Sequence, residues 1–330
     1  MKSNVTDLLS PGLKHELYEL LENSFTADAM DQLGALLFKR YSGHEQAGED
    51  RHITLSRSRA ARTLADTAEE SGKLADLIQL IAELDGKQFQ GKLLMISGAE
   101  VFFNSLARVG IVYDPTRRRL FHSRQDITEL RNWGSLRDGR TYTIAVMSVD
   151  IVGNSVIVRE LGAKKAEKLS YALLGFLQRK LHDYDGRMWN WAGDGGLFAF
   201  AFQGCADRAI MCGVDIQRSL PLFSLSPLMP VERSMELRIG IDVGPVKFSS
   251  DTGRIVSDVI NYAAHLEKGG TEPGQVSISE RVTDLCDGRL LRLFADAGEF
   301  EGLAYQRTDR LDTFASANFP LREEPDSAAG

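Results

Sequence analysis

Apolar residues in the N-terminal part of the chain recur at the spacing of helices. Each stripe repeats every three or four residues, which places its members on one face of an α-helix. The stripes comprise Leu13, Leu17, Leu20 and Leu21; Met30, Leu33, Leu36 and Leu37; and Leu74, Leu77, Ile78, Ile81 and Leu84. Residues 1–97 are therefore predicted to form a small all-helical domain, which suits an adaptor or a dimerisation element better than a catalytic one.

The apolar periodicity weakens over residues 98–140, where arginines gather at positions 117–119 and within residues 136–140. Three consecutive arginines are compatible with a phosphate-binding patch. A solvated connector is the better interpretation, because the protein around them is acidic. We expect residues 98–140 to be a linker.

From residue 141 onward, short apolar runs alternate with helical stripes. The runs of strand length cover residues 142–149, 187–192, 197–202 and 236–243, and the helical stripes cover residues 163–182 and 205–220. Pro221 is expected to stop the second helix. This β-α-β-β-α-β order is that of a ferredoxin-like fold. An α+β domain is thus predicted over residues 141–315, followed by a polar tail, residues 316–330, that we expect to be disordered.

Composition narrows the class of protein. The chain has 330 residues, a length typical of two domains. Its 39 basic and 46 acidic residues give a net charge of −7, which argues against a nucleic-acid binder. No apolar run reaches the roughly 18 residues of a membrane span, and the polar start lacks the apolar stretch of a signal peptide. Three cysteines without metal-ligand spacing fit a reducing compartment, so a cytoplasmic protein is expected.

The first candidate site follows the strand at 142–149. Asp150 ends an apolar run, and Ile151, Val152, Gly153 and Asn154 follow it. A carboxylate at the end of a buried strand needs a partner. The backbone N–H groups of the turn at Gly153 and Asn154 suit phosphate oxygens. Alternatively, Asp150 merely caps the following helix.

The second candidate site is the hairpin tip Gly193-Asp194-Gly195-Gly196. By itself this sequence indicates no more than a turn. In a ferredoxin-like sheet, however, the first strand and the hairpin are neighbours, so Asp150 and Asp194 are predicted to lie close together. Two adjacent carboxylates attract divalent cations. Oxygen ligands suit magnesium or manganese, whereas zinc prefers histidine and cysteine.

The third candidate lies in a predicted helix at residues 257–267. Asn261 and His265 are four residues apart and therefore share one helix face. Considered alone, the pair is better interpreted as part of a solvated polar stripe.

Taken together and in this order, the three segments and the strand at 237–246 resemble the class III nucleotidyl cyclases. The resemblance covers about residues 141–313 and implies a ferredoxin-like cyclase catalytic domain after the helical one. It implies that Asp150 and Asp194, with the backbone carbonyl of Ile151, bind two Mn²⁺ or Mg²⁺ ions per site. It also implies that Asn261 orients the ribose.

The chain departs from the family's pattern at two positions. His265 stands where the family has an arginine that stabilises charge on the transferring phosphoryl group. Glu301 stands in the region where the family has a phosphate-binding lysine. A histidine offers fewer donors than an arginine and titrates at roughly pH 6.5. Phosphate neutralisation would then depend more on metal ions and backbone groups.

At the positions that select the base, the chain has Asn190 and Arg254, which match neither the adenylate nor the guanylate cyclases. With Trp189 and Trp191 nearby, the chain resembles the pyrimidine cyclases of Pycsar anti-phage systems. Arginine only donates hydrogen bonds, and uracil presents an acceptor where cytosine has an amino donor, which favours UTP over CTP. The alternative is that both tryptophans are hairpin core and Arg254 is a surface residue.

The resemblance thus implies a uridylate cyclase, which converts UTP to 3′,5′-cyclic UMP and pyrophosphate. The product would be a second messenger in anti-phage defence, read by a cyclic-nucleotide-responsive effector. Because the family takes its aspartates and its asparagine helix from opposite subunits, a homodimer with shared active sites is expected. The alternatives are a cytidylate cyclase and a catalytically silent, nucleotide-binding signalling module.

Overall fold

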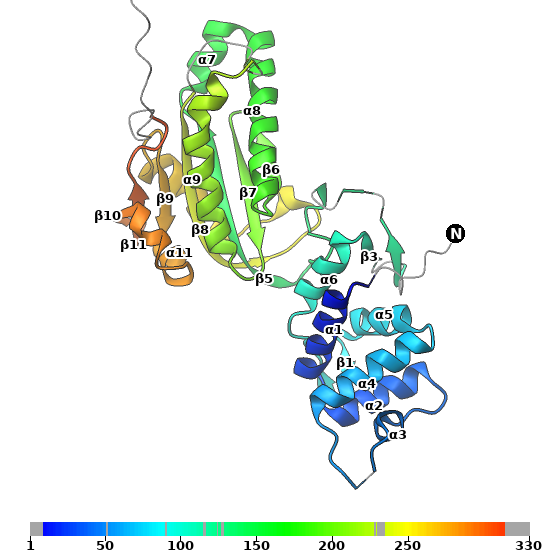
Figure 1. Ribbon diagram of the computed structural model, residues 1–330. Helices are drawn as coiled ribbons and strands as arrows, with labels where there is room; N and C mark the ends of the chain where they lie inside the picture. Colours follow the sequence, from blue (N-terminus) through cyan, green and yellow to red (C-terminus); the bar gives the residue numbers. More distant parts are fainter. Residues whose placement is uncertain are drawn as a thin grey trace, which may run out of the picture. The chain divides into compact units, whose positions relative to one another are not determined.

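The computed structural model describes residues 9–50, 52–89, 91–114, 117–123, 125–126, 129–227, 229 and 235–313. The chain divides into two compact units, with the boundary between Leu136 and Arg137 (Figure 1). The expected disordered tail at residues 316–330 lies outside the described residues. No helix in the described ranges is long and apolar enough to cross a membrane.

The first unit is built mainly from helices, as the apolar stripes predict. Its elements are α1 (Pro11–Ser24), α2 (Ala27–Leu37), α3 (Gly43–Ala47), α4 (Arg57–Glu70), α5 (Leu74–Leu84), β1 (Gln88–Phe89), β2 (Lys92–Leu93), α6 (Ala99–Arg108), β3 (Ile111–Asp114) and β4 (Arg119–His122). Two short antiparallel hairpins, β1–β2 and β3–β4, accompany the helices. The stripe residues Leu17, Leu21, Leu33 and Ile78 are buried together in one core.

The prediction of a linker at residues 98–140 is wrong for most of these residues, which belong to the first unit. Helix α6 occupies its first part and inserts Phe102, Phe103 and Leu106 into the core of the first unit. Ile111 of β3 is buried in the same core. The apolar stripe of α6 is a single short one, and the arginine-rich segment that follows it dominates the local composition. The first unit therefore extends to Leu136.

The second unit contains the predicted β-α-β-β-α-β order and further elements after it. The elements are β5 (Thr141–Ile151), α7 (Asn154–Leu161), α8 (Ala163–Asp183), β6 (Arg187–Ala192), β7 (Gly195–Ala201), α9 (Cys205–Ser224), β8 (Leu237–Lys247), the 3₁₀ turn η3 (Thr252–Arg254), α10 (Asp258–His265), the π-helical turn η4 (Leu266–Gly270), β9 (Val276–Ser279), α11 (Glu280–Leu285), η5 (Leu290–Leu293), β10 (Phe294–Phe300) and β11 (Leu303–Thr308). The predicted α+β class is confirmed.

Helix α9 does not stop at Pro221 but continues to Ser224. A proline inside a helix removes one backbone hydrogen bond. Here the last turn is held by tertiary packing, because Leu220 and Phe223 are buried in the core. The ring of Phe223 stacks on that of Phe176 at a centroid distance of 4.5 Å.

Seven strands form one mixed sheet in the order β10-β11-β9-β8-β5-β7-β6. In the four strands β8-β5-β7-β6 each strand is antiparallel to its neighbours, and their order is that of a ferredoxin-like core, whereas β9 runs parallel to β8. Strand β5 is therefore central, with β8 on one side and β7 on the other. In this register Asp150 lies opposite Arg238 on β8 and opposite Gly195 on β7.

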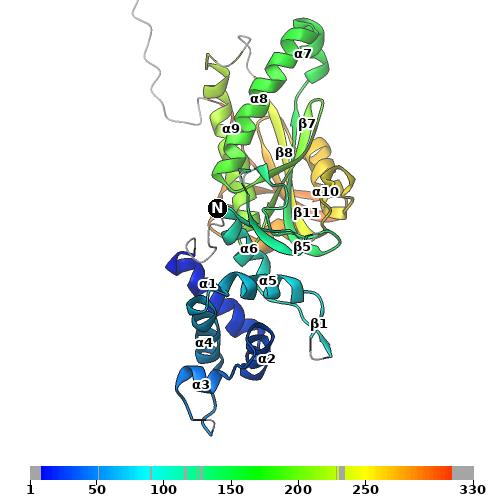
Figure 2. The same ribbon diagram turned by 90° about the vertical axis from the view of Figure 1, so that its right-hand side faces the viewer.

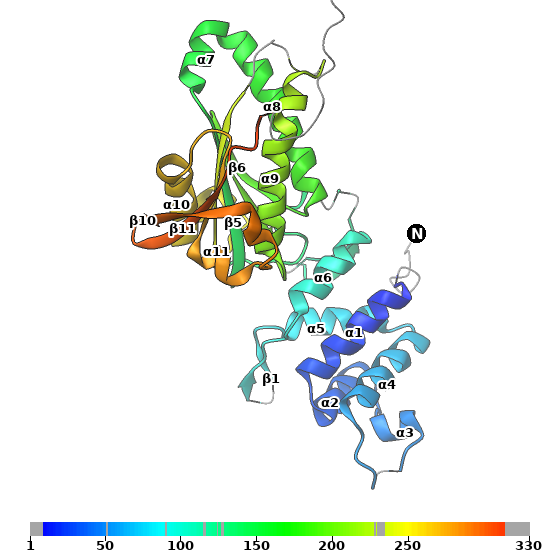
Figure 3. The same cartoon turned by 60° about the vertical axis from the view of Figure 1, so that its left-hand side comes forward.

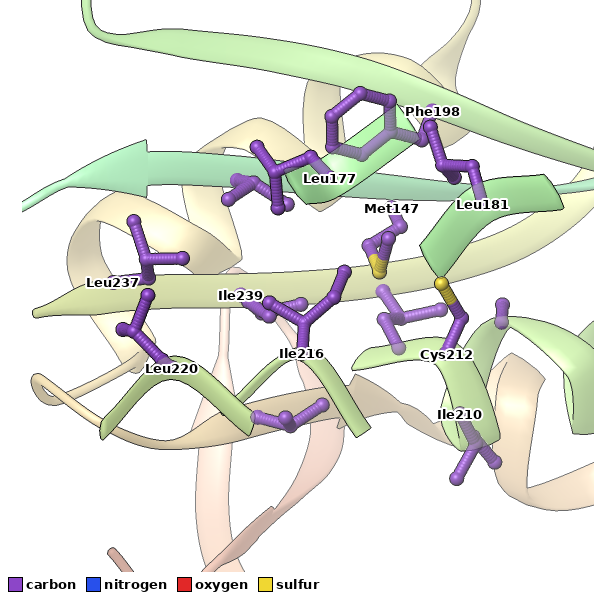
Figure 4. Close-up of a cluster of buried hydrophobic side chains, with 14 of the residues drawn as sticks. Met147, Leu177, Leu181, Phe198, Ile210, Cys212, Ile216, Leu220, Leu237 and Ile239 are labelled. Atoms are coloured by element: carbon purple, nitrogen blue, oxygen red, sulfur yellow. The ribbon is translucent and has the colours of Figure 1, made fainter. Parts of the chain in front are cut away.

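The two faces of the sheet are covered differently (Figure 2). Helices α8 and α9 pack on one face and bury a single large core, shown in Figure 4. In that core Met147, Leu177, Phe198 and Ile239 are fully buried. Helix α10 lies on the other face, beside the β10–β11 hairpin (Figure 3). The apolar runs of β5 and β8 are nearly continuous because both of their faces are covered.

Candidate active site

Asp150 and Asp194 meet where the antiparallel strands β5 and β7 lie side by side. The backbone N–H of Ile151 donates to the carbonyl oxygen of Asp194 at 3.0 Å. Asp150 lies opposite Gly195, where an added Cβ would come within 2.9 Å of the Val149 carbonyl oxygen and 3.4 Å of Oδ1 of Asp150. Glycine is required there because a side chain would displace backbone. The hairpin tip is thus pressed against the end of β5.

The turn after Asp150 leads directly into α7. Gly153 has a left-handed backbone conformation, φ +68°, and is the N-cap of that helix. Its carbonyl oxygen accepts from the backbone N–H groups of Val156 and Ile157. Asp150 is therefore not the cap, and the capping interpretation of this aspartate is wrong. Asn154 is the first residue of α7 and is half-buried.

Arg238 on β8 is the partner of Asp150. Its Nη2 donates to Oδ2 of Asp150 at 2.6 Å, a length typical of a charge-assisted hydrogen bond. Its Nε lies 3.2 Å from Oε1 of Glu267 on η4. Sequence reasoning missed both Arg238 and Glu267. The signal for Arg238 was a cation within an otherwise apolar strand at residues 237–243.

Glu267 is buried, with 7% of its surface exposed. It reaches this position because β8 and η4 approach closely at Gly240, where an added Cβ would lie 2.5 Å from the carbonyl oxygen of Ala263 and 2.5 Å from the backbone nitrogen of Glu267. Burial raises the pKa of Glu267 to about 7, and the negative charges of Asp150 and Asp194 act in the same direction. Arg238 opposes this shift without cancelling it.

This donor set fits a divalent cation. Asp150 and Asp194, which carry negative charge, and Arg238 and Lys268, which carry positive charge, all interact electrostatically with Glu267. Nε of Arg238 and Oε1 of Glu267 are buried without a hydrogen-bond partner among the described residues. Among the described residues, no group of three or more His, Cys, Asp or Glu side chains is placed so that it could hold a metal ion, so any ion would depend on two aspartates and on oxygens that are not side chains of these types. Two aspartates that leave positions for phosphate oxygens are typical of Mg²⁺ and Mn²⁺ sites.

Helix α10 presents Asn261 and His265 on its exposed surface. The helix begins at Ser257, whose hydroxyl accepts from the backbone N–H of Ile260. Nδ1 of His265 lies 2.9 Å from Oε1 of Glu301, next to the β10–β11 turn. The two positions at which the chain departs from the cyclase pattern are therefore in contact.

The candidate base-selecting residues lie on neighbouring elements. Asn190 is exposed on β6, and Arg254 ends η3. The two elements are joined because the Thr252 hydroxyl donates to the carbonyl oxygen of Trp189 at 2.7 Å. Arg254 is 85% exposed along its side chain, and its Nε lies 3.0 Å from Oδ2 of Asp251. Arg254 is a surface residue in this chain.

The two tryptophans flanking Asn190 are part of the hairpin's packing. A bulge between Met188 and Asn190 turns Trp189 inward, where it is 1% exposed. Its ring lies 6.1 Å from that of Phe248. Trp191 is half-buried and stacks on Phe198. The sequence left open whether Trp189 is part of the hairpin core. The structure supports that interpretation.

A second buried carboxylate, that of Asp242, is connected to α10 through Arg281. Asp242 on β8 is fully buried and accepts from the hydroxyl of Ser279 at 2.5 Å. Arg281 donates to both carboxylate oxygens, from Nε at 3.0 Å and from Nη2 at 2.5 Å. The same guanidinium lies over the ring of Tyr262 on α10, 5.3 Å from its centroid. Tyr262 donates to the carbonyl oxygen of Phe300.

No protein-family model matches the chain, and none of the curated proteins is similar to it. Among solved structures, it is similar to the guanylate cyclase domain of RhGC from Catenaria anguillulae in complex with GTP, with 19% identity and a TM-score of 0.44 over 52% of this chain and 98% of that chain. It is similar to the adenylyl cyclase CyaB from P. aeruginosa, with 20% identity and a TM-score of 0.45 over 52% and 95%. It is also similar to an adenylate/guanylate cyclase/hydrolase from Silicibacter pomeroyi, with 22% identity and a TM-score of 0.42 over 51% and 97%.

Proposed function

We propose that this chain is a nucleotidyl cyclase that converts UTP to 3′,5′-cyclic UMP and pyrophosphate. The observation that carries the proposal is that Asp150 and Asp194 come together at the end of β5, beside Arg238. In the reaction the ribose 3′-oxygen forms a bond to the α-phosphorus. The bond from that phosphorus to the β-phosphate bridging oxygen breaks, pyrophosphate leaves, and the hydroxyl proton passes to water. The product is cyclic because nucleophile and phosphate belong to one molecule.

Asp150, Asp194 and the Ile151 carbonyl are the residues that would hold two Mn²⁺ or Mg²⁺ ions. Such ions neutralise the triphosphate and lower the pKa of the ribose hydroxyl when bound. The backbone at Gly153 and Asn154 faces the phosphates at the start of α7, where helix N–H groups favour anions. Arg238 adds a positive charge beside them.

Asn261 orients the ribose, and His265 donates to the transferring phosphoryl group when protonated. Holding the nucleophile in line supplies a large part of such catalysis. Asn261 and His265 lie on the exposed surface of α10, where a second copy of the chain can present its aspartates. We therefore propose a homodimer with two shared sites.

Asn190 and Arg254 select the base. Both are exposed, and the hydrogen bond from Thr252 to Trp189 joins the two elements that carry them, which supports a shared role in contacting the base. An arginine donor matches the uracil O4 acceptor and opposes the amino group of cytosine. In a Pycsar-like setting cyclic UMP would act as the second messenger that switches on a cyclic-nucleotide-responsive effector during phage infection.

The decisive experiment incubates the full chain with each of the four nucleoside triphosphates, with Mn²⁺ and separately with Mg²⁺, and identifies products by mass spectrometry. We expect cyclic UMP from UTP, lost in Asp150→Asn and Asp194→Asn. Asp309→Asn, which neutralises an exposed acid on another loop, is the matched control and should stay active. Cyclic CMP or a purine product would keep the cyclase and overturn the uracil assignment. Absence of product from every nucleotide would favour the silent signalling module.

A further inference from the structure

We infer that the guanidinium of Arg238 forms an ion pair with the carboxylate of Asp150 in the metal-free protein, and that a divalent metal ion displaces it from that carboxylate. The inference rests on the proposed function to the extent that Asp150 is taken as a metal ligand. It adds a competition within the chain, in which Arg238 and the metal ion both bind the carboxylate of Asp150.

The sheet register fixes this competition. Strands β5 and β8 pair along the whole of β5, and Arg238 lies directly opposite Asp150. Nη2 of Arg238 and Oδ2 of Asp150 are 2.6 Å apart, so one of the two carboxylate oxygens is already engaged. Both side chains are about three-quarters covered, with 25% and 21% exposed. Water screens such a pair less than it screens a surface ion pair.

Glu267 gives the guanidinium a second partner within reach. Oε1 of Glu267 is 3.2 Å from Nε of Arg238, yet neither atom has an aligned hydrogen bond within the described residues. The carbonyl oxygen of Lys268 lies 3.5 Å from Nη1. Because Gly240 locks η4 against β8, Glu267 stays in place when Arg238 lets go of Asp150. A small rotation of the guanidinium then exchanges one carboxylate for the other.

Charge balance drives the exchange. Without metal, the Arg238 guanidinium lies between the carboxylates of Asp150 and Glu267. A divalent cation at Asp150 would repel a guanidinium at 2.6 Å from the same carboxylate. The metal ion therefore takes over Asp150, while Arg238 satisfies the buried oxygen of Glu267. The affinity for metal in the absence of nucleotide is lowered by the bond that must break.

The test measures Mn²⁺ binding to the nucleotide-free full chain by electron paramagnetic resonance titration. Arg238→Gln should bind Mn²⁺ about ten- to a hundredfold more tightly than the wild type, the equivalent of one charge-assisted hydrogen bond. Arg238→Lys, which keeps the charge but forms a less constrained contact, should lie in between. Arg289→Gln removes an exposed arginine that pairs with Asp287 and should leave binding unchanged.

Two outcomes separate this inference from the proposed function. If Asp150→Asn leaves Mn²⁺ binding intact, Asp150 is not a ligand and the metal site of the proposed function fails. If Asp150→Asn weakens binding while Arg238→Gln and Arg238→Lys bind Mn²⁺ no more tightly than the wild type, the competition is overturned. Circular dichroism establishes that each variant is folded, and Arg238→Lys carries the test if Arg238→Gln is not.

Discussion

Nδ1 of His265 lies 2.9 Å from Oε1 of Glu301, which joins the two positions where the chain differs from the cyclase pattern. The family places cations at both. Here one is an imidazole and the other a carboxylate, so under the proposed function the positive charge offered to a phosphate depends on protonation of His265. With Nδ1 engaged by Glu301, Nε2 is the nitrogen that would contact the substrate in the proposed function.

Replacement of His265 by arginine should make catalysis less sensitive to pH. An arginine stays charged at every pH at which an imidazole loses its proton. The ratio of kcat in His265→Arg to kcat in the wild type should therefore rise steadily from pH 5.5 to pH 8.5. The ratio cancels pH effects common to both proteins. His182→Arg, an exposed change on α8, is the control. A flat ratio would show that His265 contributes no charge.

Mixing two inactive variants tests the shared sites. Asp150→Ala and Asn261→Ala should each be inactive, and random mixing should restore about a quarter of wild-type activity. Half of the dimers are then heterodimers, and each has one intact site of two. Asp150→Ala mixed with Asp194→Ala is the matched control, because both changes fall in the same half of the site. Equal recovery in both mixtures, or in neither, contradicts a site shared between subunits.

Removal of the Arg254 side chain should relax the choice of base. The guanidinium is exposed and pairs with Asp251, so its loss leaves the core untouched. Arg254→Ala should reduce the ratio of kcat/KM for UTP over CTP by about tenfold or more, the scale of one hydrogen bond to a charged group. Arg292→Ala, another exposed arginine, should leave the ratio unchanged. Full retention of UTP preference in Arg254→Ala would assign base selection to other residues.

Local patterns were sufficient for most of the fold. Strand β6 was predicted residue for residue, since strand alternation and hairpin turns are local signals. The pairing of Arg238 with Asp150 was not predicted, because it joins residues 88 positions apart and depends on strand register. The burial of Glu267 was not predicted either, for a related reason. Its burial follows from the close approach at Gly240 and from the π-helical turn η4, neither of which has a periodic signature.

The pair of Asp242 and Arg281 should be a major contributor to the stability of the second unit. Arg281→Ala leaves a fully buried carboxylate without its cation, with the Ser279 hydroxyl and the backbone N–H of Val243 as hydrogen-bond donors. Breaking one side of a buried pair costs about 3 kcal/mol or more of unfolding free energy. The change also removes the cation over Tyr262 and so loosens α10. Urea denaturation measures the loss.

Arg289→Ala is the control for this experiment, because its pair with Asp287 is at the surface and exposed pairs contribute little. Arg281→Lys should recover part of the loss, since a lysine retains the charge but not the two-point contact. If Arg281→Ala is as stable as Arg289→Ala, the Asp242 network does not hold the unit together.

Glu267 should make the stability of the metal-free protein depend on pH. Its pKa is raised to about 7 in the folded chain, mainly by burial, from an ordinary value near 4.5. A raised folded-state pKa means that the folded protein binds this proton more tightly than the unfolded one. The stabilisation is therefore complete below about pH 4.5 and is lost as the pH rises through about 7.

The difference in unfolding free energy between the wild type and Glu267→Gln isolates this effect. Between pH 5 and pH 8 the wild type should lose about 2–3 kcal/mol of unfolding free energy relative to Glu267→Gln, as expected for a pKa shift of that size. Denaturation at four pH values in the presence of a chelator measures it, and Glu299→Gln, an exposed change on β10, should show no such trend. A difference that stays constant from pH 5 to pH 8 would mean that Arg238 keeps Glu267 charged throughout. The guanidinium of Arg238 would then form ion pairs of similar strength with Glu267 and Asp150. Release of Asp150 to a metal ion would then disturb both ion pairs.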